Sequence, residues 1–297
     1  MSALRGTPPG SAPQPAPDLG RGSRRSRILG GGQEGGRAVA VAVISTFVFF
    51  TVLILVVINS PGWPDIRRSF FNLEVFRESF PEIARKFLIN VQAFLIAEVF
   101  ILVFALLLAV LRSLPGPVFF PIRALAVGYT DLFRGIPTVL VIYILGFGAP
   151  ALQLQGVPKS ALFWGIVALV LVYSAYVAEV YRAGIESVHP SQIAAARSLG
   201  LSRWKALRFV VLPQAVRRVI PPLLNDFIGL QKDTALLALV GVLETFRRSQ
   251  VDVAGSFNYT PYLATALLFV LITIPLARLT DWLVTRERVR RQAGAAV

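Results

Sequence analysis

The chain has 297 residues, of which 55% are hydrophobic and 15% are charged, and its formal net charge is +14. The apolar residues come in long runs, which is typical of a polytopic helical membrane protein, because lipid offers backbone polar groups no hydrogen-bond partners. Cysteine is absent and histidine occurs once, at His189. This composition excludes disulfides and thiolate nucleophiles, and no catalytic residue or metal site is predicted.

Residues 1–37 are rich in Pro, Gly, Ser and Arg and are predicted to form a disordered basic tail, because they offer too little apolar surface to offset the entropy of ordering. The stretch GGGQEGG within this tail is not a phosphate-binding loop, which requires Gly-Lys-Ser/Thr. None of the four lysines follows a glycine. Any ATP hydrolysis must therefore come from another chain.

Six apolar segments are each about as long as the ~20 residues that a spanning helix needs. The first, over 38–59, is uncharged and too long for the apolar part of a signal peptide, so an uncleaved membrane helix is predicted. A stretch of mixed charge over 60–86 follows and is predicted to be an external amphipathic segment. The remaining spans are predicted at about 87–111, 122–147, 161–181, 221–243 and 262–283.

Six spans put both termini on one side of the membrane. With the N-terminus in the cytoplasm, the inner loops and tails carry more than twice as many Lys and Arg residues as the outer loops, as the positive-inside rule requires. Topology therefore accounts for the positive charge, and no nucleic-acid partner is expected. We expect a multi-pass protein of the cell membrane, with both termini, a loop at about 184–220 and a basic tail over 286–297 in the cytoplasm.

The loop at 184–220 is basic and carries helix start and stop signals. In chain order these are a cap at Ser191, a short helix over 192–199, a left-handed stop at Gly200, a cap at Ser202, a second helix over 203–212 and a stop at Pro213. Two short helices that meet at a glycine favour docking into the groove of a partner. An amphipathic helix resting on anionic headgroups fits the same pattern, and His189 is expected to be an ordinary loop residue.

This loop resembles the cytoplasmic motif of binding-protein-dependent ABC importers, Glu-Ala-Ala-x(3)-Gly-x(9)-Ile-x-Leu-Pro. The matching residues are Ala194-Ala195-Ala196, Gly200, Val210 and Leu212-Pro213. The flanking stretches SAYVAEVYRAGIESV, LPQAVRRVIPPLLNDFI and LQKDTALLALVG, and DLFRGIP upstream, resemble the polar amino-acid branch of that family, which takes histidine, glutamate, glutamine and arginine. Together they cover about residues 88–286.

The resemblance implies an all-α type I ABC importer permease, with a core of five transmembrane helices over 87–285 and one extra N-terminal helix. It further implies docking to a cytoplasmic ABC ATPase dimer that holds ATP and Mg, pairing with a second permease subunit of the same or a homologous chain, and delivery of solute by an external binding protein. The implied ATPase-docking residues are Ala194, Ala195, Ala196, Arg197, Gly200, Leu201, Arg203, Leu212 and Pro213. Three positions depart from the family pattern: Ala194 replaces Glu, Ile136 replaces Thr and Ala183 replaces Gly.

Charged groups inside spans cost roughly 2.5–3.5 kcal/mol near a helix centre, so each requires a reason. Glu179 and Arg182 are spaced i, i+3 and are predicted to form a structural pair, as are Arg278 and Asp281. The candidates for the solute pathway or for gating are Glu98, Asp131, Arg134, Lys232, Asp233 and Thr234. Lys232 and Asp233 are expected to find partners in Asp131 and Arg134, as a solute site or as an interhelical clamp, and Gly135 with Pro137 predicts a hinge or an entry bend.

Two other classes fit less well. An intramembrane enzyme would need a nucleophile with its base or a metal triad, and the chain has no such motif. An ion-coupled secondary transporter for amino acids, acting without an ATPase, is the alternative. It would leave unexplained the helix start and stop signals of the loop at 184–220, and the internal repeat typical of that class is absent from the sequence.

Overall fold

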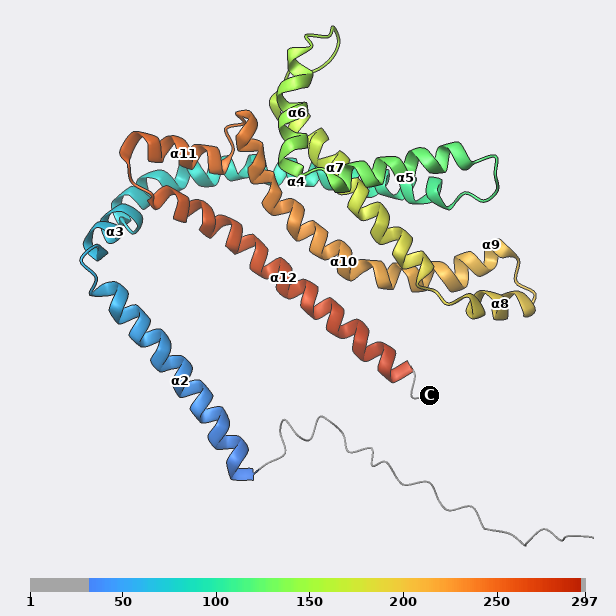
Figure 1. Ribbon diagram of the computed structural model, residues 1–297, viewed down its shortest axis with the longest axis horizontal. Helices are drawn as coiled ribbons and strands as arrows, with labels where there is room; N and C mark the ends of the chain where they lie inside the picture. Colours follow the sequence, from blue (N-terminus) through green and yellow to red (C-terminus); the bar gives the residue numbers. More distant parts are fainter. Residues whose placement is uncertain (1–31, 295–297) are drawn as a thin grey trace, which may run out of the picture. The chain divides into compact units, whose positions relative to one another are not determined.

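The structure is a computed structural model that describes residues 32–294. Every regular element among these residues is helical (Figure 1). The elements are α2 (Gly32–Ile58), α3 (Trp63–Phe70), α4 (Leu73–Ser113), α5 (Phe120–Gly135), α6 (Thr138–Ala151), α7 (Ala161–Glu186), α8 (Pro190–Ser198), α9 (Arg203–Ala206), the π-helix η1 (Leu207–Val211), α10 (Leu212–Asp233), the 3₁₀ helix η2 (Thr234–Val240), α11 (Thr245–Ser256) and α12 (Thr260–Gly294). The chain divides into two units between Pro64 and Asp65.

The first unit contains α2, whose apolar stretch of 21 residues, Ala38–Ile58, has no buried residue. A helix that is apolar all round and buries nothing suits contact with lipid. The helix begins at Gly32, so the predicted disorder is wrong for residues 32–37, because extending an existing helix costs far less than nucleating one. The rest of the predicted tail, residues 1–31, lies outside the described residues.

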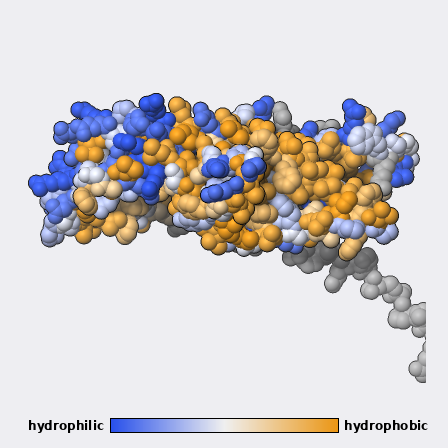
Figure 2. Space-filling view, turned by 90° about the horizontal axis from the view of Figure 1, so that it is seen from above, coloured by the Kyte–Doolittle hydropathy of each residue, from blue (hydrophilic) through white to orange (hydrophobic). Residues whose placement is uncertain are grey.

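The second unit is built around α4 and α7, which pack along one another (Figure 1). Its core consists of small and branched apolar side chains from these two helices, joined by residues of α5, α6, α10 and η2. Fully buried examples are Ala97, Ile101, Leu169 and Val172. Many large apolar side chains outside this core are exposed, and hydrophobic residues cover much of the face seen in Figure 2. Such a surface is suited to lipid and to partner subunits.

Fewer described helices meet a length and hydropathy criterion for spanning than the six that the sequence predicts. Four described helices are long and apolar enough to cross a membrane, or five if α5 and α6, which are bent by 102° at their junction, form one span. The fifth predicted segment, over 221–243, consists of the end of α10 followed by the 3₁₀ helix η2, and it does not meet that criterion. Charged and polar residues such as Asp226 and Lys232 lower the hydropathy of α10.

A buried polar cluster joins α4, η2, α11 and α12. Glu244 is fully buried at the start of α11, where its carboxylate accepts hydrogen bonds from the backbone N–H groups of Phe246 (2.9 Å) and Arg247 (2.7 Å) and from Asn90 Nδ2 (2.8 Å). Burial raises the pKa of Glu244, and the three donors act in the opposite direction. Thr245 Oγ1 donates to the Ile83 carbonyl (3.1 Å), so the cluster is tied to α4 at two points.

Candidate functional site

The first helix of the predicted docking loop, α8, starts at Pro190 and is capped by His189. The Nδ1 atom of His189 accepts a hydrogen bond from the Ser191 backbone N–H (3.2 Å) and lies 2.7 Å from Ser191 Oγ. The predicted cap at Ser191 is therefore wrong, and so is the interpretation of His189 as an ordinary loop residue. Pro190 is the reason, because proline is favoured in the first turn of a helix and so moves the cap to the preceding residue.

Gly200 ends α8 in a left-handed conformation, with φ at +84°. The Gly200 N–H donates to the Arg197 carbonyl (3.0 Å) and the Leu201 N–H to the Ala196 carbonyl (3.2 Å). These two bonds form a Schellman motif, which satisfies carbonyls that the helix end leaves without donors. The predicted left-handed glycine is confirmed, and the position requires a residue without a Cβ.

The second helix does not end at Pro213, contrary to the sequence prediction. Ser202 Oγ accepts from the Lys205 N–H (3.3 Å) and α9 begins at Arg203 as expected. The helix then passes through the π-helical turn η1 and continues as α10, with Pro213 in the first turn of α10. Proline clashes with the carbonyl four residues earlier in a regular helix. The wider π turn, in which the Leu212 N–H bonds back to the Leu207 carbonyl, relieves that conflict.

The two short helices expose large apolar side chains together with basic ones. Leu199 is 84% exposed, Trp204 68% and Phe209 63%. Among the expected docking residues, Ala194, Ala195, Arg197, Gly200, Leu212 and Pro213 are exposed, Leu201 is half-buried and Ala196 is buried; Arg203 is placed as the first residue of α9. Exposed apolar groups bordered by charge are typical of a surface that binds a partner.

The charges expected near the solute pathway do not pair as predicted. Asp233 Oδ2 accepts a hydrogen bond from Tyr173 Oη (2.9 Å). The guanidinium of Arg134 lies 5.9 Å from the centre of the Tyr176 ring. Lys232 and Asp131 are exposed, and neither forms an ion pair with a described residue. Lys232 and Asp131 lie on different helices, α10 and α5, which do not pack against each other to any extent, and that separation explains why the expected partners do not meet.

The other two candidates are Thr234 and Glu98. Thr234 is fully buried, where its Oγ1 donates to the Gln231 carbonyl (2.7 Å) and accepts from Asn90 Nδ2 (3.3 Å), so it is part of the buried cluster around Glu244. Glu98 is half-buried on α4. Among the described residues, no ion pair or side-chain hydrogen bond joins any two of the six pathway candidates.

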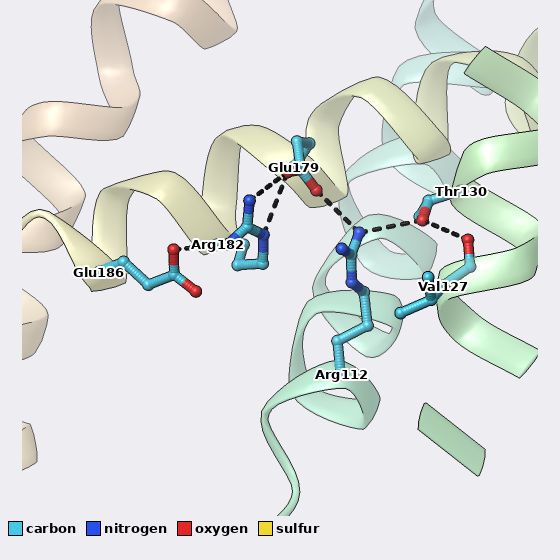
Figure 3. A network of polar contacts seen from close by, with 6 residues as sticks. All are labelled: Arg112, Val127, Thr130, Glu179, Arg182 and Glu186. Atoms are coloured by element: carbon cyan, nitrogen blue, oxygen red, sulfur yellow. Dashed lines mark hydrogen bonds and ion pairs between the residues drawn. The ribbon is translucent and has the colours of Figure 1, made fainter. Parts of the chain in front are cut away.

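Glu179 and Arg182 do form an ion pair on α7, and it is part of a larger network (Figure 3). Arg112 at the end of α4 contacts Glu179 Oε2 through Nη1 (2.7 Å), and the same nitrogen lies 2.9 Å from Thr130 Oγ1 of α5. Arg182 also pairs with Glu186 (2.5 Å). One carboxylate thus holds guanidinium groups from two helices.

Sequence reasoning missed Arg112, Thr130 and Glu186 as members of this network. Arg112 closes an apolar run, so it was interpreted only as a topology charge. Its partner Glu179 lies 67 residues away, and no local spacing connects them. The pair of Arg182 with Glu186 could have been predicted, because residues spaced i, i+4 lie on one face of a helix.

Comparisons with known proteins agree on one family. The family model described as binding-protein-dependent transport system inner membrane component matches residues 116–289. The chain is 33% identical over 209 residues to the probable amino-acid permease protein YxeN of Bacillus subtilis (strain 168), covering 70% of this chain and 92% of that protein. It is 38% identical over 165 residues to the probable glutamine ABC transporter permease protein GlnM of the same organism, covering 54% of this chain and 73% of that protein.

Solved structures show the same relationship at the level of the fold. A chain from the crystal structure of an amino acid ABC transporter with histidines superposes with a TM-score of 0.66 at 27% identity, covering 72% of this chain and 98% of that chain. A chain of the methionine ABC transporter MetNI in an inward-facing conformation superposes with a TM-score of 0.54 at 19% identity, covering 69% of this chain and 95% of that chain. The latter shares the fold.

Proposed function

Because the chain belongs to the family of binding-protein-dependent transport system inner membrane components, and its relatives are amino-acid ABC transporter permeases, we propose that it is the membrane-spanning subunit of an ATP-driven importer. The solute is a polar amino acid or a close relative, delivered by an external solute-binding protein. ATP and Mg are held by a separate cytoplasmic ATPase dimer, and a second permease subunit completes the pathway. The protein is a multi-pass membrane protein with both termini in the cytoplasm.

The observation that carries this proposal is the Schellman turn at Gly200 between two short helices. The turn fixes α8 and α9 relative to each other, and the exposed side chains of Leu199 and Trp204 flank it. A rigid pair of helices with apolar anchors is suited to a groove in a folded partner, because little conformational entropy is lost on docking. Ala194 stands where the family motif has Glu, so docking relies on these apolar anchors and on neighbouring basic groups such as Arg197.

Solute passage is assigned to the groups near the end of α10. Lys232 is exposed and, apart from the effect of its charge on the neighbouring Asp233, forms no ion pair among the described residues, so its ammonium suits contact with the carboxylate of an amino acid. Asp131, Arg134 and Asp233 remain pathway or gating candidates, as does Glu98. Thr234 is assigned a packing role, because its hydroxyl is buried and fully used.

The test of docking is Gly200→Val. A branched side chain at φ +84° is strained, so α8 and α9 should lose their fixed angle while the membrane helices still insert. We expect the tagged variant to reach the membrane at wild-type yield but to lose the ATPase that co-purifies with the wild type in mild detergent, and to import no amino acid in the presence of ATP.

Gly156→Val is the matched control. Gly156 has a similar positive φ of +78° and open space around its Cα, but it lies in the loop between α6 and α7. It should suffer the same backbone strain and keep the ATPase. Equal ATPase recovery and coupled uptake for Gly200→Val would contradict the docking assignment. Uptake by the wild type alone, without an ATPase or ATP, would instead favour an ion-coupled secondary transporter.

A further inference from the structure

The end of α7 that leads into the docking loop is held from two other helices. From α4, Arg112 contacts Glu179. From α10, Arg218 Nη1 donates to the carbonyl of Ser187, the residue that caps α7. Only Val188 and His189 separate this cap from the start of α8 at Pro190. A displacement of α8 must therefore be taken up by the end of α7 or by the contacts that hold it.

The contact from α4 is an ion pair between Arg112 and Glu179 that is largely shielded from water. The side chain of Arg112 is 13% exposed and that of Glu179 is 22% exposed, so both charges are largely withdrawn from water. Breaking such a pair by removing one partner leaves the other charge poorly solvated. The Arg112 guanidinium also contacts Thr130 on α5, whose hydroxyl is buried and donates to the Val127 carbonyl (2.8 Å) (Figure 3).

The remaining charges of the network stay on α7. Arg182 binds Glu179 and Glu186, which lie one turn before and one turn after it, so this part stiffens the last turns of the helix without connecting it to a neighbour. Among the described residues, Arg112 is the ion-pair partner that ties Glu179 to another helix. Beside the apolar packing of α7 on α4 and α5, the ionic link between the docking-loop end of α7 and these two helices therefore passes through one guanidinium.

We infer that Arg112 is a positioning residue for energy coupling: it makes α4 and α5 follow the end of α7 when the ATPase moves the docking loop. This inference rests on the proposed function. Without Arg112, the ends of α4 and α5 follow the end of α7 less closely, so more ATP is hydrolysed for each solute that passes. Removal of Arg112 should therefore separate ATP hydrolysis from import, which a loss of folded protein would not do.

The experiment uses the complete importer, with its ATPase and binding protein, reconstituted in lipid vesicles. Its readout is the number of ATP molecules hydrolysed per amino acid imported. Arg112→Gln should raise this ratio roughly tenfold, the factor expected when an equilibrium loses one charge-assisted hydrogen bond of ordinary strength. The matched control is Arg248→Gln, because Arg248 forms a 2.7 Å ion pair with Asp252 within α11, away from the docking loop, and its loss should leave the ratio unchanged.

Two further outcomes keep the inference separate from its premise. If the wild type hydrolyses ATP with import and Arg112→Gln has the wild-type ratio, the inference about Arg112 is wrong and the proposed function stands. If the wild type imports without ATP, the proposed function fails and this inference fails with it. Should Arg112→Gln not be recovered folded, Glu179→Gln decides, because it removes the charge that Arg112 binds and keeps the shape of the side chain. A raised ratio supports the inference and a wild-type ratio overturns it.

Discussion

At the scale of single residues, Glu244 shows how a buried charge is made acceptable. Glu244→Ala removes the cap of α11 and leaves Asn90 without one of its acceptors. We expect a loss of roughly 1–3 kcal/mol of stability, the usual cost of leaving a buried polar group unsatisfied, seen as a lower thermal midpoint of the purified protein in detergent. Because burial raises the pKa of Glu244, the neutral isostere Glu244→Gln should lose less. Equal midpoints for Glu244→Ala and the wild type would contradict this account.

A residue's role could be predicted from the sequence when its partner lies close to it along the chain. The turn at Gly200 and the pair of Glu179 with Arg182 follow from spacing within one helix, and both are present. The cap at His189 was missed because Pro190 shifts the start of the helix by one residue. Arg112 was missed because only the packing of α4 against α7 brings it to Glu179.

At the scale of helices, the close approach of α7 and α10 depends on Gly184. A Cβ at this position would lie well inside van der Waals distance of Val219 Cγ2, and near the Ala215 carbonyl. Gly184→Ala should therefore destabilise the pair of helices by about 1–3 kcal/mol, the typical cost of overpacking, as measured by the thermal midpoint.

Two variants test this packing explanation. Gly184→Ala combined with Val219→Ala should recover part of the loss, because the smaller side chain returns the space. Gly148→Ala is the control within a helix, since Gly148 in α6 has open space around it and alanine is the better helix former there. A Gly184→Ala variant as stable as Gly148→Ala would exclude a steric role for Gly184.

The helices themselves were predictable in part. Gly135 and Pro137 indicated a hinge, and the structure has a 102° bend where α5 meets α6. The predicted end of the helix at Pro213 was wrong, because a π turn lets the helix continue through the proline and has no simple sequence signature. The predicted external segment over 60–86 includes α3 and the first turns of α4, which continues as one helix of 41 residues to Ser113.

At the scale of the whole molecule, the all-helical importer-permease fold was predictable, because the loop motif and its flanks identify the family and long apolar runs identify membrane helices. The number of spans stays a prediction, because four or five described helices meet a length and hydropathy criterion, whereas two termini on one side require an even number. The segment over 221–243 is the doubtful one, because α10 carries charges whose cost in a membrane depends on neighbouring helices and partner subunits that one sequence does not reveal.

Topology gives the last prediction, and the absence of cysteine makes it simple to test. Ser198 in α8 and Ser256 in α11 are both exposed. A membrane-impermeant maleimide should label Ser256→Cys in intact cells and should label Ser198→Cys only after the membrane is permeabilised. This follows from the excess of Lys and Arg on the cytoplasmic side. Labelling of Ser198→Cys in intact cells would contradict the proposed orientation.

The sharp corner between α5 and α6 also has a consequence for the order in which the protein is made. A proline at a corner leaves backbone carbonyls without their helical donors, and lipid cannot supply any. The Arg134 carbonyl beside this corner accepts from Tyr176 Oη (3.4 Å), and Tyr176 is synthesised 42 residues later. The donor that this carbonyl finds belongs to α7, so the corner between α5 and α6 gains the bond only once α7 has packed beside it, and the bend is completed by a helix that comes later in the chain.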